Sequence, residues 1–386
     1  MKILFLEASQ SFGGAQKSTL DIASQLQRIG HQILIVDFWG SSEEFIQEIK
    51  VYNLNYMILE NRQDSIIISN PVLSKKIRNG LKFTYKNIIY RNKLKDIINE
   101  FSPDIVSVHN IKCLSILERN AAYKIDYIER GWSGSHQTSR LKRFFLKKFK
   151  PRIITVSQAS RQAVFTAGIE NLENIKVMHD AIDDNVYLSE VRAPSTIDFS
   201  NQPIRLLHSG GFISTKGQHV AIEVARELKR KSIEFELVLM GVIYPSQASK
   251  DYYNYLLKLI EKYKLTDQVT MVVNQYDVLD YFSKCHVLIH PSATEGLPRV
   301  ALEALSFGKP VIANPVGGVI DVVINNVTGY ITDYNDIEQY VEFITKYINT
   351  PSIYQMQSKN AKMLIKNNYL KSNQKELLSK LYPPSL

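Results

Sequence analysis

The chain has 386 residues, of which 45% are hydrophobic and 22% are charged. This balance is typical of a globular protein and excludes a chain that is disordered throughout. Because hydrophobic cores stop growing beyond about 250 to 300 residues, the length favours two domains. The two cysteines, Cys113 and Cys285, are too few for a disulfide framework or a thiolate metal site, so a reducing compartment is expected.

The N-terminus and the apolar runs bear on location. The N-terminal Met-Lys leads into only five residues, 3–7, before polar residues follow, which is too short for the central region of a signal peptide. No uninterrupted apolar run approaches the roughly 20 residues that span a bilayer. We therefore expect a cytoplasmic protein that is soluble or lies on the inner face of the plasma membrane.

The formal net charge of +9 calls for an anionic partner, and nucleic acid, anionic lipid and a polyanionic substrate are the candidate classes. None of the usual nucleic-acid recognition modules is recognisable in the sequence, so nucleic acid is not expected. The basic residues are densest in residues 140–152, where they alternate with Leu141, Phe144, Phe145 and Phe149 at roughly helical spacing. Two interpretations are equally open: an interfacial helix on an anionic membrane surface, or a solvated helix whose phenylalanines enter the core.

The N-terminal half opens with a pattern typical of a parallel α/β sheet. Residues 2–6 predict a buried strand, residues 8–14 a loop, and a helical pattern follows that Gly30 closes. Residues 31–36 predict the next strand, and this order of strand, helix and strand forms a βαβ unit. Further strands are predicted at residues 105–108, around Ile128 and at residues 153–156.

A similar order begins again near residue 204. Residues 204–208 predict a strand, Ser209 to Gly211 a loop, and residues 218–231 a helix. The polar, proline-containing stretch 190–202 between the two halves is the predicted linker. The other predicted elements of this half are helices at 247–264 and 299–307 and strands at 235–240, 269–273, 287–290 and 310–313.

Open α/β sheets bind ligands at the carboxyl ends of their strands. The glycine pairs at 13–14 and 210–211, and the loop that carries Glu295, all follow predicted strands. Two doubly wound halves that face each other would form a cleft, and domain interfaces are favoured ligand sites. We therefore predict two Rossmann-like domains with a binding site at these loops.

Gly13 and Gly14 lie where backbone N–H groups could approach an anion at a helix N-terminus. They form neither the Gly-x-Gly-x-x-Gly dinucleotide fingerprint nor a P-loop. A tight turn is the simpler explanation of this pair.

Lys216 and Gly217 directly precede the predicted helix 218–231. A lysine at a helix start opposes the macrodipole, which suits a site where an anion lies between helix N–H groups and the ammonium. Gly217 would let phosphate oxygens come close. An exposed loop lysine that faces water is an equally open interpretation.

Glu295 and Glu303 flank the start of the predicted helix 299–307. Pro298 fits the first turn, so Glu295 lies in the loop before the helix and Glu303 inside it. A carboxylate can accept two neighbouring sugar hydroxyls, and a helix N-terminus suits a phosphate. The alternative is a solvated face on which Arg299 and Glu303 form an i,i+4 pair. The residues alone favour this alternative slightly.

The segment from Pro291 to Gly318 resembles the signature of retaining glycosyltransferase family 4. The resemblance is carried by a strand followed by Glu-Gly, six residues and Glu303, and then by Gly-Lys-Pro-Val-Ile-Ala-Asn-Pro-Val-Gly-Gly. It extends over nearly the whole chain, with further matches at Gly13 and Gly14, residues 156–158 and 177–183, Asp321, Thr328 and Gly329. It implies the GT-B fold, with an acceptor-side domain at 1–190 completed by a C-terminal helix at 366–386, and a nucleotide-sugar-binding domain at 200–365.

The resemblance also implies a role for each candidate residue. Glu303 would bind the ribose hydroxyls, Glu295 with the backbone N–H groups of residues 296–299 the donor sugar, and Lys216 with Gly14 the diphosphate. The implied reaction is front-face attack with retention, in which catalysis consists of positioning and of stabilising the departing diphosphate. The sequence contains no Asp-x-Asp, so neither a metal nor another cofactor is expected. The expected donor-binding residues are Gly13, Gly14, Gly210, Lys216, Asn274, Glu295, Gly296, Leu297, Pro298, Arg299 and Glu303, and the expected catalytic residues are Glu295, Lys216 and Arg130.

Three positions depart from the family pattern. The family's arginine five residues before the lysine is Gly211 here, and its donor-side histidine aligns loosely with Arg130. The Asn-Gly of the linking loop is Asp180-Ala181. Arg130 is expected to replace some of the lost positive charge, with His109 or His136 nearby.

The sequence thus predicts a glycosyltransferase that moves a sugar from a nucleotide-sugar donor to a glycan, lipid-linked or polymeric acceptor in cell-surface polysaccharide or glycoconjugate synthesis. Residues 274–276 are expected near the nucleobase. A second hypothesis, which Gly211 and Arg130 support, is a catalytically silent GT-B subunit that recognises glycan or protein for a partner transferase. A third is a GT-B enzyme that hydrolyses or epimerises the nucleotide sugar.

Overall fold

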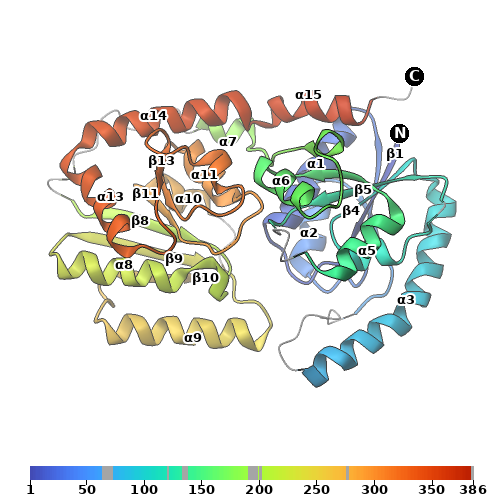
Figure 1. The fold of residues 1–386 in the computed structure, drawn as a ribbon, viewed down its shortest axis with the longest axis horizontal. Coiled ribbons are helices and arrows are strands. Elements are labelled where there is room, and N and C mark those ends of the chain that lie inside the picture. The colour runs from blue at the N-terminus through green and yellow to red at the C-terminus, as the bar shows by residue number, and fades with distance from the viewer. Residues whose placement is uncertain are drawn as a thin grey trace. The chain divides into compact units, whose positions relative to one another are not determined.

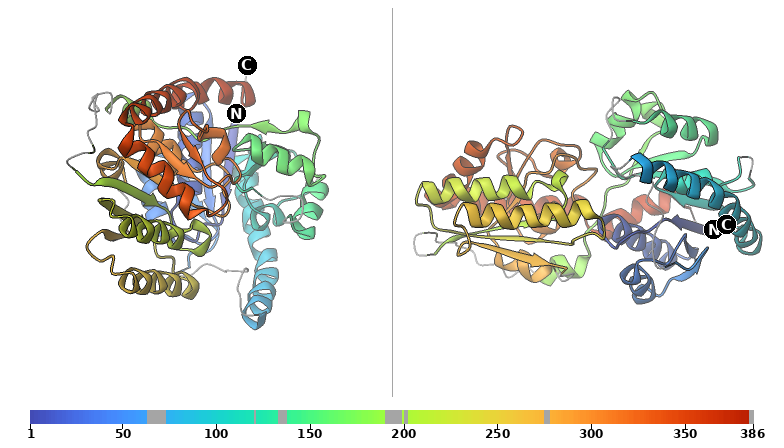
Figure 2. Two further views of the ribbon diagram at one scale, coloured as in Figure 1. Left: turned by 60° about the vertical axis from the view of Figure 1, so that its left-hand side comes forward. Right: turned by 90° about the horizontal axis from the view of Figure 1, so that it is seen from below.

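The computed structural model describes residues 1–62, 73–119, 121–132, 138–189, 199, 202–274 and 278–383. The chain forms two compact units. Unit 1 comprises Met1–Val156, Ser160–Met178 and Lys375–Leu386, and unit 2 comprises Ser157–Ala159 and His179–Gln374. Figures 1 and 2 show that helices cover both faces of the sheet in each unit.

Unit 1 contains, among its described residues, a seven-stranded parallel sheet in the order β3-β2-β1-β4-β5-β6-β7. Its central strand β1 pairs with β2 on one side and β4 on the other, so that Ile3 lies beside both Ile33 and Ile105. The strands are β1 (Lys2–Glu7), β2 (Gln32–Asp37), β3 (Asn55–Ile58), β4 (Ile105–Val108), β5 (Lys124–Glu129), β6 (Arg152–Thr155) and β7 (Lys176–Val177). The helices are α1 (Gly14–Arg28), α2 (Glu43–Val51), α3 (Leu73–Phe101), α4 (Ile111–Ser115), α5 (Arg140–Phe149), α6 (Gln158–Thr166) and the 3-10 helix η1 (Leu172–Asn174).

Unit 2 repeats this topology with a six-stranded parallel sheet, among the residues described there, in the order β10-β9-β8-β11-β12-β13. The strands are β8 (Ile204–Ser209), β9 (Phe235–Gly241), β10 (Val269–Val273), β11 (Val287–His290), β12 (Val311–Ala313) and β13 (Gly329–Ile331). The helices are α7 (Asp184–Ser189), η2 (Ser214–Lys216), α8 (Gln218–Arg230), α9 (Gln247–Lys262), α10 (Leu279–Lys284), α11 (Arg299–Ser306), α12 (Val319–Val322), α13 (Ile337–Asn349), α14 (Pro351–Asn368) and α15 (Lys371–Leu381), which continues into unit 1.

The order of strands decides where a ligand can bind. In each sheet the direction of strand addition reverses beside the first strand, between β1 and β4 in unit 1 and between β8 and β11 in unit 2. At such a switch point, the loops that leave neighbouring strands separate to opposite faces of the sheet and open a crevice. The prediction of two doubly wound α/β halves is therefore confirmed, and each half has its own switch point.

The central strands form because they are buried on both faces. Residues 3–6 of β1 and all of β11 are buried, as expected for near-continuous apolar strands between two helical layers. The observed bounds of β10 and β11 coincide with the predicted strands 269–273 and 287–290. Three strands had no prediction, β3, β7 and β13, because they are short or lack continuous apolar character.

The basic segment 140–152 is helical only in its first ten residues. Helix α5 ends at Phe149, because Lys150 adopts a left-handed conformation with φ of 46° and Arg152 already belongs to β6. Leu146 and Phe149 are buried, whereas Leu141 and Phe144 are 60% and 58% exposed. Phe149 enters the core as the second interpretation predicted, and the interfacial interpretation of the exposed residues stays a prediction.

The two units divide between Met178 and His179, upstream of the linker expected at 190–202. Only Phe199 and Gln202 of that linker are among the described residues. None of the described helices is both long enough and apolar enough to cross a membrane.

Candidate active site

Lys216 lies at the switch point of unit 2, in the loop that follows β8. Its side chain packs beside Gly210, and its Nζ lies 2.7 Å from Oε1 of Glu295. The lysine side chain is 28% exposed and the glutamate side chain 9%. The interpretation of Lys216 as a loop lysine that faces only water is therefore wrong, and the structure brings two of the predicted residues into one ion pair.

Glu295 lies in the loop after β11, and a second cation-forming residue approaches it there. Nε2 of His290, the last residue of β11, lies 3.0 Å from the same oxygen, Oε1. Burial by itself would raise the pKa of Glu295, but Lys216 and His290 hold that pKa well below its usual range. The carboxylate is therefore ionised at neutral pH.

His290 was not recognised in the sequence. It is 1% exposed at the end of a buried strand, a position that apolar residues occupy far more often than histidine. A second buried histidine is His208 of β8. Its Nε2 lies 2.8 Å from the carbonyl oxygen of Lys216. Burial lowers the pKa of His208 to about 4, so this ring is neutral and its N–H can hold the lysine backbone in place. The signal available in the sequence was a polar residue at the carboxyl end of each central strand.

Gly217 is required by packing within unit 2. It has a left-handed φ of 77°, and a Cβ atom there would lie 2.1 Å from the carbonyl oxygen of Pro291. The glycine therefore allows the loop before α8 to cross close to the loop after β11. This close crossing is what brings Lys216 within reach of Glu295.

Glu303 lies on the second turn of α11 and is 7% exposed. Nε of Arg299 lies 3.2 Å from its Oε1, and the side chains of this pair are 12% and 10% exposed. The i,i+4 pair exists as considered in the sequence, but it is buried rather than solvated. A buried carboxylate beside a helix N-terminus is a suitable acceptor for hydroxyl groups of a ligand.

The loop that links Glu295 to α11 is tied by a backbone hydrogen bond to Gly318, the residue before α12. The carbonyl of Gly296 accepts a hydrogen bond from the N–H of Gly318 at 3.1 Å, Leu297 is buried, and Pro298 is the N-cap residue of α11. Asn274 follows β10 at the same edge of the sheet and is exposed, with its Oδ1 3.2 Å from the N–H of Ile243. Gln275 and Tyr276, also expected near the nucleobase, lie outside the described residues.

Gly211 stands where an arginine was expected, and the structure gives a reason. A Cβ atom at Gly211 would lie 2.6 Å from the ring of Tyr244, which follows β9. The tyrosine ring therefore occupies the space that an arginine stem would enter. Gly211 and Tyr244 form a matched pair that the sequence alone did not indicate.

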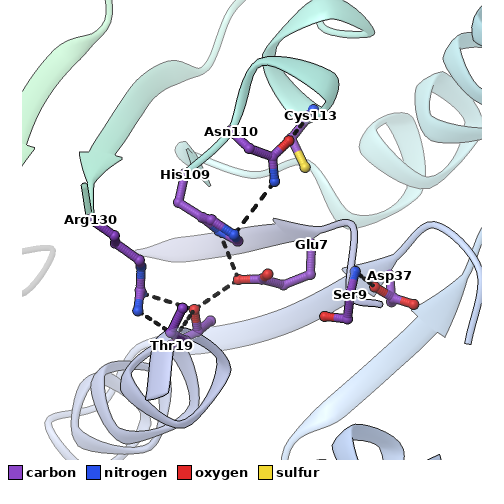
Figure 3. A network of polar contacts seen from close by, with 9 residues as sticks. Glu7, Ser9, Thr19, Asp37, His109, Asn110, Cys113 and Arg130 are labelled. Carbon is purple, nitrogen blue, oxygen red and sulfur yellow. Dashed lines mark hydrogen bonds and ion pairs between the residues drawn. The ribbon is translucent and has the colours of Figure 1, made fainter. Parts of the chain in front are cut away.

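The candidates Arg130, Gly13 and Gly14 belong to unit 1, and Figure 3 shows Arg130 in a network of polar contacts with Glu7, Thr19 and His109. Glu7 ends β1, and its Oε1 accepts a hydrogen bond from Thr19 Oγ1 at 2.7 Å and lies 3.2 Å from Nδ1 of His109. Burial would raise the pKa of Glu7, but His109 and Arg130 lower it below its usual value. Glu7 was not recognised as a candidate residue in the sequence, where the predicted strand ended at residue 6.

Arg130 follows β5 and donates hydrogen bonds to helix α1. One guanidinium nitrogen donates to the carbonyl oxygen of Ala15 and the other to Thr19 Oγ1, at 2.9 Å for the latter. His109 is the neighbour that Arg130 was expected to have, with Glu7 and Thr19 between them (Figure 3). The other histidine suggested for this place, His136, lies outside the described residues.

The backbone at Gly13 and Gly14 does not form a strained turn. Gly13 has an extended conformation with φ of −163°, and a Cβ atom at Gly14 would meet no atom within 4 Å. The tight-turn explanation of this glycine pair is therefore wrong. Helix α1 begins at Gly14, so its first N–H groups have no acceptor within the helix.

Comparison with known proteins matches nearly the whole chain to glycosyltransferases. The family model "Glycosyltransferase Family 4" matches residues 12–186, and the model "Glycosyl transferases group 1" matches residues 194–364. An uncharacterised glycosyltransferase of Haemophilus influenzae is 22% identical over 92% of both chains. The capsular polysaccharide biosynthesis glycosyltransferase CapM of Staphylococcus aureus is 24% identical over 58% of this chain and 56% of its own.

Among solved structures, Anabaena HepE in complex with UDP-glucose superposes with a TM-score of 0.80 at 21% identity, over 99% of both chains. WaaG, a glycosyltransferase involved in lipopolysaccharide biosynthesis, gives a TM-score of 0.69 at 16% identity. Two family models that follow each other along the chain, together with this fold, show that the protein is a glycosyltransferase of family 4 with the GT-B fold.

Proposed function

We propose that this glycosyltransferase takes a sugar from a nucleotide-sugar donor with retention of configuration and passes it to a glycan, lipid-linked or polymeric acceptor. The observation that carries the donor part of this proposal is the cluster of Lys216, Glu295 and His290 at the switch point of unit 2. It combines a fixed carboxylate and a partly exposed ammonium at the edge where such sheets bind nucleotides.

Each part of the donor would meet a different set of candidate residues. The Glu303 carboxylate suits the ribose hydroxyls and that of Glu295 the sugar hydroxyls, because an ionised carboxylate accepts several hydrogen bonds. The ammonium of Lys216 and the N–H groups of residues 296–299 suit the negative diphosphate. Asn274 is assigned to the nucleobase side. Gly13 and Gly14 of unit 1 are assigned to phosphate binding through backbone N–H groups at the start of α1.

The reaction breaks the bond between the sugar C1 and the phosphate oxygen, and the electron pair leaves with the diphosphate. The acceptor hydroxyl forms the new C1–O bond on the same face, and its proton passes to the departing phosphate. No covalent bond to the protein is formed. The protein contributes by holding the reactants in place and by stabilising the charge that develops on the diphosphate. Lys216 is suited to that task, and no metal or other cofactor is assigned to it.

The acceptor part of the proposal is coarser. CapM is named for capsular polysaccharide biosynthesis and WaaG for lipopolysaccharide biosynthesis, which supports a role in cell-surface polysaccharide or glycoconjugate synthesis. The exposed Leu141 and Phe144 on the basic helix α5 support a peripheral position at an anionic, cytoplasmic membrane face.

A donor screen tests the proposal. UDP-, GDP- and ADP-sugars are added to the purified protein, thermal midpoints and sugar transfer are measured, and the anomeric configuration of the product is read by NMR. One nucleotide sugar should raise the midpoint of the wild type and much less that of Glu303→Ala. Retained turnover in EDTA would support the assignment without metal. If no nucleotide sugar binds, the donor proposal fails; if donor is consumed equally without acceptor, the enzyme is a hydrolase.

A further inference from the structure

Helix α3 (Leu73–Phe101) presents apolar side chains on two opposite faces. On one face Phe83, Tyr90 and Leu94 are buried in the core of unit 1. The rotation of 100° per residue places a second set on the other side of the helix. These residues are Ile77, Leu81, Tyr85 and Ile88, with exposed fractions of 55%, 68%, 70% and 66%. We call this set the α3 stripe.

A single exposed apolar residue needs no explanation, but a continuous row of four does. The residues of the α3 stripe are spaced by three or four positions, so they are neighbours on one face of the helix. Phe83, Tyr90 and Leu94 already account for the packing of α3 on unit 1. Core formation therefore does not explain the α3 stripe, and a binding surface does.

The charge on α3 indicates what would bind there. Between residues 73 and 95 the sequence contains no aspartate or glutamate. Arg78 and Lys82 are exposed and lie beside the stripe on the helical wheel, whereas Lys86 and Lys95 pair with Glu60 and Glu118 of neighbouring segments. The α3 stripe is bordered by cations, and residues 73–95 contain no anions. Such a helix face suits a partner with an apolar interior and negative charges at its surface.

We propose that the α3 stripe is an interfacial surface that binds anionic lipid bilayers. Ile77, Leu81, Tyr85 and Ile88 would enter the boundary between headgroups and acyl chains, while Arg78 and Lys82 contact lipid phosphates. Tyr85 suits this depth, because its ring is apolar and its hydroxyl can stay at the headgroups. The inference rests on the membrane position proposed above and assigns it a second surface on a helix other than α5, and it does not depend on the donor or on the reaction.

Vesicle binding tests the proposal. The full-length protein is floated with vesicles of phosphatidylcholine alone or of phosphatidylcholine mixed with phosphatidylglycerol. The variant Leu81→Ser/Tyr85→Ser removes the centre of the stripe. Its matched control is Leu257→Ser/Tyr255→Ser, which removes the same two residue types from α9 of unit 2, where they are 41% and 47% exposed. Arg78→Glu/Lys82→Glu reverses the bordering charge without touching an apolar residue.

The wild type and the α9 control should bind the anionic vesicles equally, and the stripe variant on the order of tenfold more weakly. The charge variant should lose the preference for phosphatidylglycerol. Unchanged binding of both α3 variants, or no binding by the wild type, would overturn the proposal. A change from dimer to monomer in the stripe variant, without vesicle binding by the wild type, would overturn it in favour of contact between copies of the chain.

Two further measurements separate this proposal from others. Thermal midpoints of the α3 variants should equal that of the wild type, because the substituted side chains are exposed; if the stripe variant unfolds, the charge variant decides the outcome. Sugar transfer to a water-soluble acceptor should be unchanged in both α3 variants. An inactive wild type that still binds anionic vesicles through α3 would contradict the proposed reaction and leave this proposal standing.

Discussion

In each unit a carboxylate, a histidine and a basic side chain gather near the switch point, although the carboxylate and the basic residue come from different strands in the two units. In unit 1, Glu7 lies 3.2 Å from His109, and in unit 2, Glu295 lies 3.0 Å from His290. In both, the carboxylate belongs to the end of a central strand or the loop after it, and nearby cations lower its pKa. The partners of the third residue, Arg130 in unit 1 and Lys216 in unit 2, differ between the two clusters.

In unit 1 the basic side chain, Arg130, forms hydrogen bonds to the protein itself. Arg130 donates to Ala15 and Thr19, and Thr19 in turn donates to Glu7, so the arginine joins β5 to the first turns of α1. In unit 2, Lys216 contacts Glu295 directly and stays 28% exposed, which leaves its other N–H donors accessible. We infer that Arg130 positions the start of α1, whereas Lys216 is the residue that meets a ligand.

The largest effect is expected for Lys216→Ala. It removes the ligand-facing charge, so kcat/KM should fall by on the order of 100-fold or more. It also leaves Glu295 ionised and buried without its main partner, which should cost about 3 kcal/mol in the free energy of unfolding. Steady-state kinetics and urea denaturation measure the two effects.

The double variant Lys216→Ala/Glu295→Gln is the control for that stability loss. It should recover most of the unfolding free energy, because the amide carries no charge to desolvate, yet it should stay inactive. Equal stability of the single and double variants would show that the ion pair does not hold this loop.

Arg130→Ala tests the structural half of the comparison. Two hydrogen bonds from a charged group to α1 are lost, which should lower the free energy of unfolding by up to about 3 kcal/mol. Any loss of activity should follow the fraction of folded protein and the KM for donor, with little change in kcat. Arg161→Ala, which removes a more exposed arginine bonded to the carbonyl of Leu172, is the matched control. A large fall in kcat at unchanged thermal midpoint would instead make Arg130 a catalytic residue.

Acid should lower the free energy of unfolding of unit 2, because His208 is buried in its neutral form. Its pKa is lowered to about 4 by burial, while the unfolded chain binds a proton at an ordinary value near 6.5. The unfolded state therefore binds more protons than the folded state between these values, and stability falls as the pH drops from about 6.5 to about 4. At pH 5 the loss from this residue is about 2 kcal/mol.

Urea denaturation at pH 7 and pH 5 measures this loss, and His208→Asn should reduce the difference between the two. Asp37 in unit 1 acts in the opposite direction, because burial raises its pKa to about 6 and folding then binds an extra proton between about 4 and 6. An unchanged pH dependence in His208→Asn would remove His208 from this account.

The smallest effect is expected at Gly211 and Tyr244. Gly211→Arg alone should destabilise unit 2 by about 1 kcal/mol or more, because the new side chain meets the Tyr244 ring. Combined with Tyr244→Ala, the arginine gains room and can reach a diphosphate, so the KM for donor should fall severalfold relative to Tyr244→Ala alone. Equal KM values in these two variants would show that this pair does not face the donor.

The sequence alone predicted the repeated α/β order well, because buried parallel strands are continuous apolar runs that need no tertiary information to recognise. Strands β10 and β11 were predicted with their observed bounds for this reason. The long helix α3 had no prediction, because two opposite apolar faces and many lysines hide the single stripe that marks an ordinary surface helix.

For the site, the sequence determined which residue types stand at the strand ends and that Lys216, Glu295 and Glu303 belong to a family 4 pattern. Only the tertiary structure decided which of them meet. Whether Lys216 faces water or Glu295 depends on the close crossing that Gly217 permits at Pro291, and whether Glu303 is solvated depends on what packs around α11. Glu7 in unit 1 and Tyr244 in unit 2 were missed because contacts between segments that are distant in sequence determine a side chain's partners, and local patterns carry no record of them.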